Sequence, residues 1–124
     1  MDIISLLHDN LSTTVILFFL VVGVWGLLEF ARGGVLGGSL AGALIIGQVL
    51  IVVQGAFGMV LYVVGPRPSD PVHILYGLSA ALVMPALWYY LRDRAPRQLL
   101  FFFSLISLFI VGLAIRGMTT GSLE

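Results

Sequence analysis

The sequence predicts an all-α protein, a bundle of four transmembrane helices that alternate in direction across the bilayer. Of its 124 residues, 60% are hydrophobic and only 10% are charged, and the mean hydropathy is +1.12. The apolar residues fall into four stretches of about the length, roughly 20 residues, that a helix needs to cross a hydrocarbon core. The links between the stretches are short, which favours antiparallel neighbours in an up-down-up-down bundle. We therefore expect residues 1–124 to form one integral membrane domain.

The limits of the four spans are predicted from the residues that interrupt the apolar runs. The breaks are a glycine-rich turn at 32–38, a proline-containing loop at 65–70 and an arginine-rich turn at 92–97. The spans between them must be helices, because backbone groups in lipid need internal partners and four strands could not close a barrel. They cover about residues 11–31, 39–64, 71–91 and 98–115, and the first could begin as early as Ile3.

Arginine placement predicts the orientation in the membrane. The side shared by the first and third turns holds four of the arginines: Arg32, Arg92, Arg94 and Arg97. The opposite side holds Arg67 and Arg116. Because cytoplasmic loops carry an excess of basic residues, we expect an inner (plasma) membrane protein whose arginine-rich turns are cytoplasmic. Both termini and the proline-containing loop would then lie outside, in the periplasm.

Composition argues against several classes of function. Cysteine is absent, so the chain has no disulfide, no thiolate metal site and no thiol nucleophile. The net charge of zero argues against a nucleic-acid partner. No carboxylate lies in the middle of a span, which argues against a proton pump or an ion-coupled transporter. Since no phosphate loop or nucleophile motif occurs either, we expect a subunit rather than an enzyme acting on its own.

Small residues predict where helices approach each other, because close backbone contact drives helix association in lipid. A Gly38-x-x-x-Gly42 motif opens the second span. Two further helical stripes are rich in small residues: Gly47, Ile51, Gly55 and Gly58 in the second span, and His73, Gly77, Ala80, Ala81 and Met84 in the third. These stripes are compatible with simple helix packing. They are also compatible with room for a flat cofactor beside Gly55, Gly58 and Gly77.

Two polar side chains and one proline interrupt the apolar spans. Gln48 and Gln54 lie within the second span, where we expect them to face the bundle and form interhelical hydrogen bonds. Pro85 lies within the third span and is expected to kink it. Neither glutamine is expected to act as a catalytic group.

The two histidines are the residues best suited to carry chemistry. His73 lies in the first turn of the third span, at the outer rim, and a neutral imidazole is a good axial ligand for haem iron. His8 lies near the start of the first span, which begins on the same side of the membrane. A facing pair is what a six-coordinate b-type haem requires, so His8 and His73 are candidate iron ligands. The alternative is an interfacial histidine bonded to a loop or to water.

One quantity argues against the pair. His8 is 23 residues from Ala31, whereas His73 is 18 residues from Leu91. At a rise of 1.5 Å per residue, the two histidines would differ in level by about 7 Å if those ends were aligned. Arg67 and Arg116 share the outer side, where they could bind the anionic propionates of a haem. They could equally be solvated or bound to lipid headgroups.

Several segments resemble heme A synthase. They are QGAFG at 54–58, the proline-containing loop that follows, VHIL at 72–75, and GLAIRGMTTG at 112–121, which resembles that family's helix-ending pattern of glycine, arginine, threonine and glycine. His8 stands where the family has a histidine at the start of the helix two spans earlier. The resemblance covers most of the chain, about half the length of that eight-helix family. It implies a haem-binding half-bundle with His8 and His73 as ligands and Arg116 near a propionate.

The chain departs from that family at positions that bear on activity. His8 is followed by Asp9, where the family has arginine. The outer loop has no glutamate of the kind implicated in the synthase reaction, and the chain has no counterpart of the family's outer-loop cysteines. Synthase activity is therefore not expected.

Two functions remain in view. The preferred one is a small integral membrane subunit that binds haem b and transfers electrons within a larger respiratory or photosynthetic membrane complex. The alternative is a cofactor-free accessory subunit that docks on a larger membrane complex through its glycine-rich helix faces and through lipid. A small transporter assembled as an oligomer is a third reading.

Overall fold

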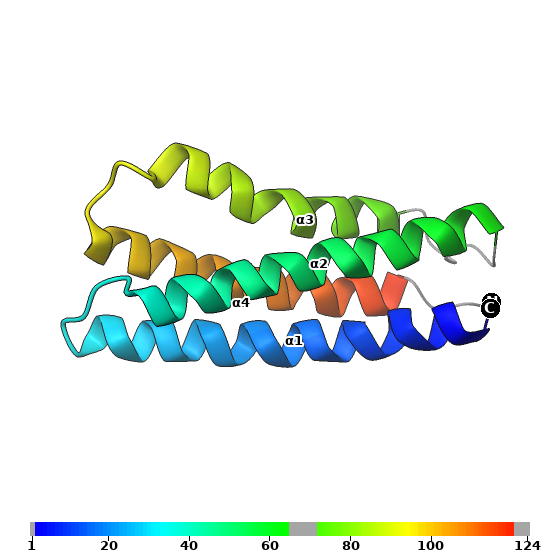
Figure 1. The fold of residues 1–124 in the computed structure, drawn as a ribbon, viewed down its shortest axis with the longest axis horizontal. Helices are drawn as coiled ribbons and strands as arrows, with labels where there is room; N and C mark the ends of the chain where they lie inside the picture. The colour runs from blue at the N-terminus through cyan, green and yellow to red at the C-terminus, as the bar shows by residue number, and fades with distance from the viewer. Residues whose placement is uncertain (1, 65–71, 121–124) are drawn as a thin grey trace.

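The described part of the protein consists of four long helices (Figure 1). The structure is a computed structural model and describes residues 2–64 and 72–120. Within these ranges, the helices are α1 (Asp2–Ala31), α2 (Gly38–Val64), α3 (Val72–Leu91) and α4 (Pro96–Thr120), with no strand. Each helix is long and apolar enough to cross a membrane. The predicted all-α transmembrane fold is confirmed, and the protein is an integral membrane protein in contact with lipid.

The helices form an antiparallel ring. Figure 1 shows the turn from α1 to α2 and the turn from α3 to α4 at one end, and the start of α1 and the end of α4 at the other. Packing is most extensive between α1 and α4 and least extensive between α2 and α3. Only consecutive helices and the pair α1 and α4 pack closely, so α1 and α3 occupy opposite corners of the ring.

Helix ends follow from local backbone chemistry. The α1 helix ends because Gly33 adopts a left-handed conformation, with a φ of 85°. The N–H of Gly34 then donates to the carbonyl of Glu29 at 2.8 Å, which satisfies a carbonyl in the last turn. The α4 helix begins at Pro96, a residue tolerated in the first turn because the N–H groups there have no helical partner. It also continues to Thr120, beyond the predicted limit at residue 115.

The most tightly packed interface lies between α1 and α4. Phe19 of α1 and Leu100 of α4 are fully buried. A Cβ added to Gly23 would lie 2.7 Å from Leu108 Cδ2, and one added to Gly26 would overlap the hydroxyl of Ser104. By contrast, no described atom lies within 4 Å of a Cβ added to Gly38 or Gly42. The close approach of α1 to α4 therefore depends on the glycines of α1. On α2, Gly47 and Gly58 lie against Phe19 and His8 of α1, whereas the predicted Gly38-x-x-x-Gly42 motif has no such close neighbour.

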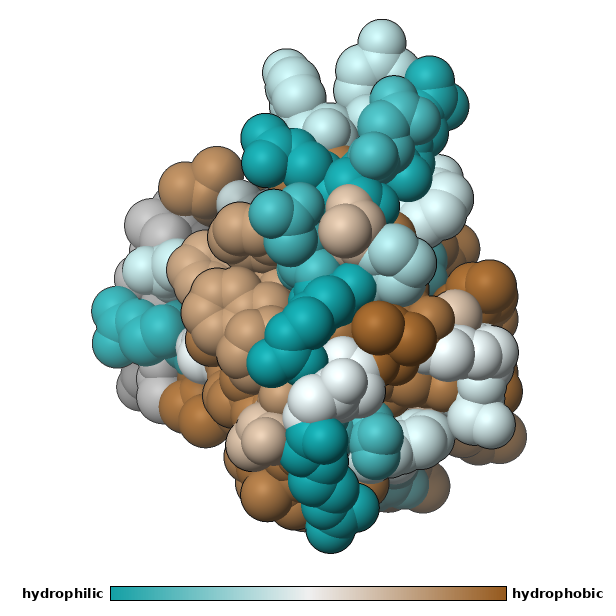
Figure 2. Space-filling view, turned by 90° about the vertical axis from the view of Figure 1, so that its left-hand side faces the viewer, coloured by the Kyte–Doolittle hydropathy of each residue, from teal (hydrophilic) through white to brown (hydrophobic). Residues whose placement is uncertain are grey.

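The end that carries both turns is charged. Figure 2 views this end and shows hydrophilic residues gathered across it, with hydrophobic residues on either side. Arg97 links the two turns, because its Nη1 donates to the Gly34 carbonyl at 3.0 Å and its guanidinium lies 4.0 Å from the centre of the Phe30 ring. Four exposed arginines share this end: Arg32, Arg92, Arg94 and Arg97.

Candidate functional site

The two histidines lie together at the end of the bundle opposite the charged turns. His8 is in the second turn of α1 and His73 is in the first turn of α3. Their ring centroids are 6.2 Å apart, with an angle of 75° between the ring planes. Both residues are half-buried. Because α1 and α3 occupy opposite corners, the two imidazoles meet across the diagonal of the bundle.

The difference in level of about 7 Å expected from residue counting does not keep the rings apart. That expectation aligned Ala31 with Leu91. Figure 1 shows instead that α1 extends beyond the end of α3 on the side of the turns. The extra length of α1 lies on the side of the turns. At the opposite end of the bundle, His8 and His73 are therefore at about the same depth along the bundle axis.

A backbone carbonyl of α4 orients His73. The Nδ1 atom of His73 is 2.7 Å from the carbonyl oxygen of Gly117. A carbonyl only accepts hydrogen bonds, so Nδ1 must carry the hydrogen and donate it. In the neutral imidazole, Nε2 then holds a free lone pair.

A backbone carbonyl of α2 orients His8 in the same way. The Nδ1 atom of His8 is 3.3 Å from the carbonyl oxygen of Gln54. In a regular helix that oxygen also accepts the N–H of Gly58, so His8 uses its second lone pair. The approach depends on the missing side chain of Gly58, because a Cβ there would lie 3.1 Å from His8 Cε1. The Nε2 atom of His8 is again the one with a lone pair.

A short polar chain supports His8. The hydroxyl of Ser12 donates to the His8 carbonyl at 3.0 Å and accepts a hydrogen bond from Gln54 Nε2 at 2.6 Å. The interhelical hydrogen bond expected of Gln54 is therefore present, and Ser12 is the partner that the sequence did not identify. The other amide atom, Gln54 Oε1, is buried and has no hydrogen-bond partner in the described part of the chain.

The other predicted site residues differ in their placement. Arg116 directly precedes Gly117, and its guanidinium carbon lies 5.8 Å from the centre of the Tyr76 ring. Gly55 and Gly77 are exposed, and no described atom lies within 4 Å of a Cβ added to either. Arg67 lies outside the described residues.

The separation of the two imidazoles is compatible with two ligands of one metal ion. Metal-ligating histidines usually donate their second ring N–H to a carbonyl or carboxylate, as His8 and His73 both do. Metal–imidazole bonds of about 2 Å would place the two Nε2 atoms about 4 Å apart, with the ring centres farther out. The observed 6.2 Å between centroids is of this order.

A bare metal ion would lack further protein ligands. Within residues 2–64 and 72–120, no group of three or more histidine, cysteine, aspartate or glutamate side chains could hold a metal. Two histidines are too few for a typical protein metal site, which uses at least three protein ligands. Two histidine ligands would be sufficient only where a macrocycle such as haem supplied the equatorial ligands.

A second polar contact joins α2 and α3 nearer the middle of the bundle. Pro85 has no N–H, so the carbonyl of Ala81, four residues earlier, lacks its helical partner. The side chain of Gln48 replaces that partner, because Nε2 donates to the Ala81 carbonyl at 2.9 Å. The interhelical hydrogen bond expected of Gln48 is present, and it satisfies the backbone group that Pro85 leaves unpaired.

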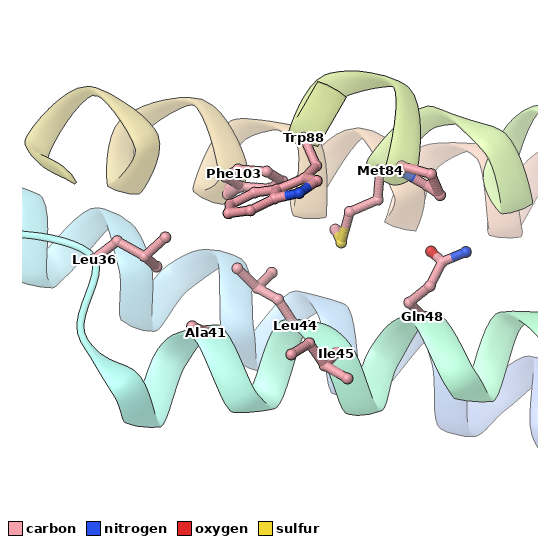
Figure 3. A pocket seen from close by; sticks show the side chains of 9 residues that line it. Leu36, Ala41, Leu44, Ile45, Gln48, Met84, Trp88 and Phe103 are labelled. Atoms are coloured by element: carbon pink, nitrogen blue, oxygen red, sulfur yellow. The ribbon is translucent and has the colours of Figure 1, made fainter. Parts of the chain in front are cut away.

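A cavity of about 410 Å³ lies beside this contact, between α2 and α3. Figure 3 shows Leu44, Ile45 and Gln48 of α2 facing Met84 and Trp88 of α3. The two helices diverge toward the charged turns in Figure 1, which leaves this space between them. Apart from Gln48 and Pro85, the residues that line the cavity are apolar, so little in the sequence marks it.

The contact between Gln48 and Ala81 gives a testable prediction about stability. Gln48→Met should lower the free energy of unfolding by about 1–2 kcal/mol, because the Ala81 carbonyl loses its partner inside the bilayer. In a Pro85→Ala background the same change should cost clearly less, because the new N–H of residue 85 pairs with that carbonyl. Reversible unfolding in mixed micelles, followed by circular dichroism, measures both values. Strictly additive effects would contradict this account of the contact.

Comparison with family models, curated proteins and solved structures finds no match to this chain.

Proposed function

We propose that the protein is a small integral membrane subunit that binds one b-type haem between His8 and His73 and transfers electrons. The observation that supports this most strongly is the paired geometry of the two imidazoles, which are 6.2 Å apart between centroids. Each donates its Nδ1 hydrogen to a backbone carbonyl and keeps a lone pair on Nε2. Two imidazoles that each take an orienting bond and lie beside each other across the bundle are more than the joining of helices requires.

The chain's own residues would have distinct parts. His8 and His73 would ligate the iron through Nε2, while the carbonyls of Gln54 and Gly117 would fix their tautomers and ring orientations. Gly58, which has no side chain, would allow the His8 ring to lie close to α2. The bound haem would supply one-electron chemistry, and the apolar helices around it would set the local dielectric and thus the potential.

The location of the pair would determine where electrons enter or leave. If the charged turns face the cytoplasm, as the arginine distribution predicts, the haem would lie near the outer leaflet. Arg116 is at that end of α4 and is suited to bind a propionate, a part also proposed for Arg67. The subunit would then exchange electrons with a partner at the outer face of a respiratory or photosynthetic complex.

The test is the absorption spectrum of the purified full chain, produced with an adequate haem supply and extracted in a mild detergent. The expected result is one haem b per chain, with the sharp α band of a six-coordinate haem on reduction. Organic extraction identifies the haem type independently of the protein. A helical, monodisperse preparation that contains no haem, even after incubation with hemin, would refute the proposal.

A cofactor-free accessory subunit is the second candidate. The observation that favours it is the open space around the glycines of α2 and α3, since Gly42, Gly55 and Gly77 have no described atom within 4 Å of an added Cβ. Such faces could accept a helix of a larger complex or lipid. Under this alternative, the protein would co-purify with its complex equally well with or without both histidines, and no haem would be found.

A further inference from the structure

We propose that the cavity between α2 and α3 binds the ring of a lipid-soluble quinol, with one ring hydroxyl donating to Oε1 of Gln48. This site involves other residues than the histidine pair and does not require that haem be bound. Four features of the cavity support the proposal: its size, its aromatic lining, its single unsatisfied acceptor, and the depth at which that acceptor lies.

The cavity has the size and lining expected of a site for a flat apolar ring. Its volume of about 410 Å³ falls within the range of about 300–1,000 Å³ typical of small-molecule sites. Trp88 and Phe103, whose ring centroids are 6.3 Å apart, form one wall, and Met84 adds a polarizable thioether. Figure 3 shows these side chains on one side of the cavity and the aliphatic residues of α2 on the other.

The cavity is accessible from the bilayer. Ile45 and Trp88 line it and are also exposed on the surface of the bundle, with 66% and 51% of their surface accessible. Both belong to helices that cross the membrane, so this exposed surface is covered by lipid. A ligand dissolved in the bilayer can therefore enter between α2 and α3 without passing through water.

The buried polar group in the cavity lining that lacks a partner is an acceptor. Gln48 Nε2 donates to the carbonyl of Ala81, which fixes the orientation of the amide. The remaining atom, Oε1, is buried and has no hydrogen-bond partner among the residues that the structure describes. In Figure 3 this oxygen is on the side of Met84, and the nitrogen is turned away. A buried acceptor selects a ligand with a hydroxyl or N–H donor, and a quinone offers only acceptors.

The depth of Gln48 favours a quinol over other lipid alcohols. Gln48 lies near the middle of α2, whereas Leu36, at the opposite end of the cavity, lies in the turn before that helix. A sterol or a long-chain alcohol keeps its single hydroxyl at the polar interface. A quinol has hydroxyls on opposite edges of its ring, so one can reach Gln48 while the other points toward the turn.

The first experiment compares the two redox forms of one ligand. The full chain with Trp25→Phe keeps Trp88 as its single tryptophan and is placed in lipid nanodiscs. Ubiquinol and ubiquinone analogues with short tails are titrated separately, with Trp88 emission reporting occupancy and extraction with chromatography measuring the bound ligand. The quinol should bind about tenfold more tightly than the quinone, the ratio expected of one hydrogen bond to a buried acceptor. Equal affinities, or tighter binding of cholesterol or a long-chain alcohol, would overturn the proposal.

The second experiment uses matched variants. Ala41→Phe places a ring in the cavity and should weaken quinol binding more than tenfold, while Val49→Phe, on an exposed part of α2 that does not line the cavity, should leave it unchanged. Gln48→Met in the Pro85→Ala background keeps the Ala81 carbonyl paired but removes the acceptor, so it should abolish the preference for quinol over quinone. A preference that persists in this double variant, or equal effects of the two phenylalanines, would refute the site.

Discussion

His73→Ala is expected to reduce the haem content of the purified protein to less than a tenth of the wild-type value and to abolish the α band of the six-coordinate reduced haem. The reason is that no other residue could replace a lost ligand, because within the described residues no other histidine lies near the pair. Disturbing the partners that orient a metal ligand already costs about 10–100-fold in affinity, and removing the ligand costs more. Haem extracted per chain and the reduced-minus-oxidised spectrum measure the effect.

The alanine variant also removes the bond to the Gly117 carbonyl, so a second variant is needed to separate ligation from folding. His73→Asn keeps an amide N–H of similar reach to the Nδ1 hydrogen, and it can still donate to that carbonyl. We expect it to preserve helix content and thermal stability while losing haem as completely as the alanine variant. His8→Ala should lose haem as well. Normal haem content and an unchanged spectrum in both His73→Asn and His8→Ala would exclude the pair as ligands.

The helices were predictable because the bilayer imposes a length and an apolar character on every span. Prolines and glycines mark the breaks, so the observed ends of α1 and α3 agree with the predicted ends at Ala31 and Leu91. The end of α4 was not predictable in this way. Arg116 and the polar residues after it suggest departure from the membrane, whereas the helix continues, with the Gly117 carbonyl paired to the imidazole of His73.

Much of the histidine site could also be expected from the sequence, because an even number of crossings between two residues puts them on the same side of the membrane. The sequence could not identify the groups that orient the rings. The carbonyls of Gln54 and Gly117 belong to the backbone, which every residue has, so they leave no mark in the residue types. Gly58 was the one residue type that could have pointed to this site. Its lack of a side chain has a purpose only because the His8 ring lies against it, and the sequence does not show that contact.

The cavity was less predictable than the histidine pair, because it results from the relative inclination of two helices. Its one specific signal is a proline in α3 together with a glutamine in α2, and their relation appears only when Gln48 is seen to pair with the carbonyl that Pro85 leaves free. Residue patterns predict which face of a helix is apolar, but not how far two apolar faces stand apart.

Gly26→Leu is expected to cause a large loss of stability. A Cβ at residue 26 would overlap the Ser104 hydroxyl and lie 2.9 Å from Ser104 Cβ. Ser104 has little freedom to move, since it is 2% exposed and its hydroxyl is bonded to the Leu100 carbonyl at 2.6 Å. Overpacking usually costs about 1–3 kcal/mol, and a leucine side chain between the two most closely packed helices should cost at least about 3 kcal/mol. Unfolding in mixed micelles, followed by circular dichroism, measures the change in free energy.

Two comparisons separate this steric effect from a general effect of replacing glycine. Gly112→Leu is the matched control, because Gly112 is an exposed glycine of α4 with no described atom within 4 Å of an added Cβ, and its free energy of unfolding should change by less than about 0.5 kcal/mol. Gly26→Ala combined with Ser104→Gly moves the Cβ from α4 to α1 and should recover most of the stability lost in Gly26→Ala alone. Equal costs for the two leucine variants would mean that α1 and α4 do not pack as described.

Since α1 carries His8 and α4 carries the carbonyl that orients His73, a loss of this interface should also displace the two imidazoles, so Gly26→Leu should lose haem and Gly112→Leu should keep it.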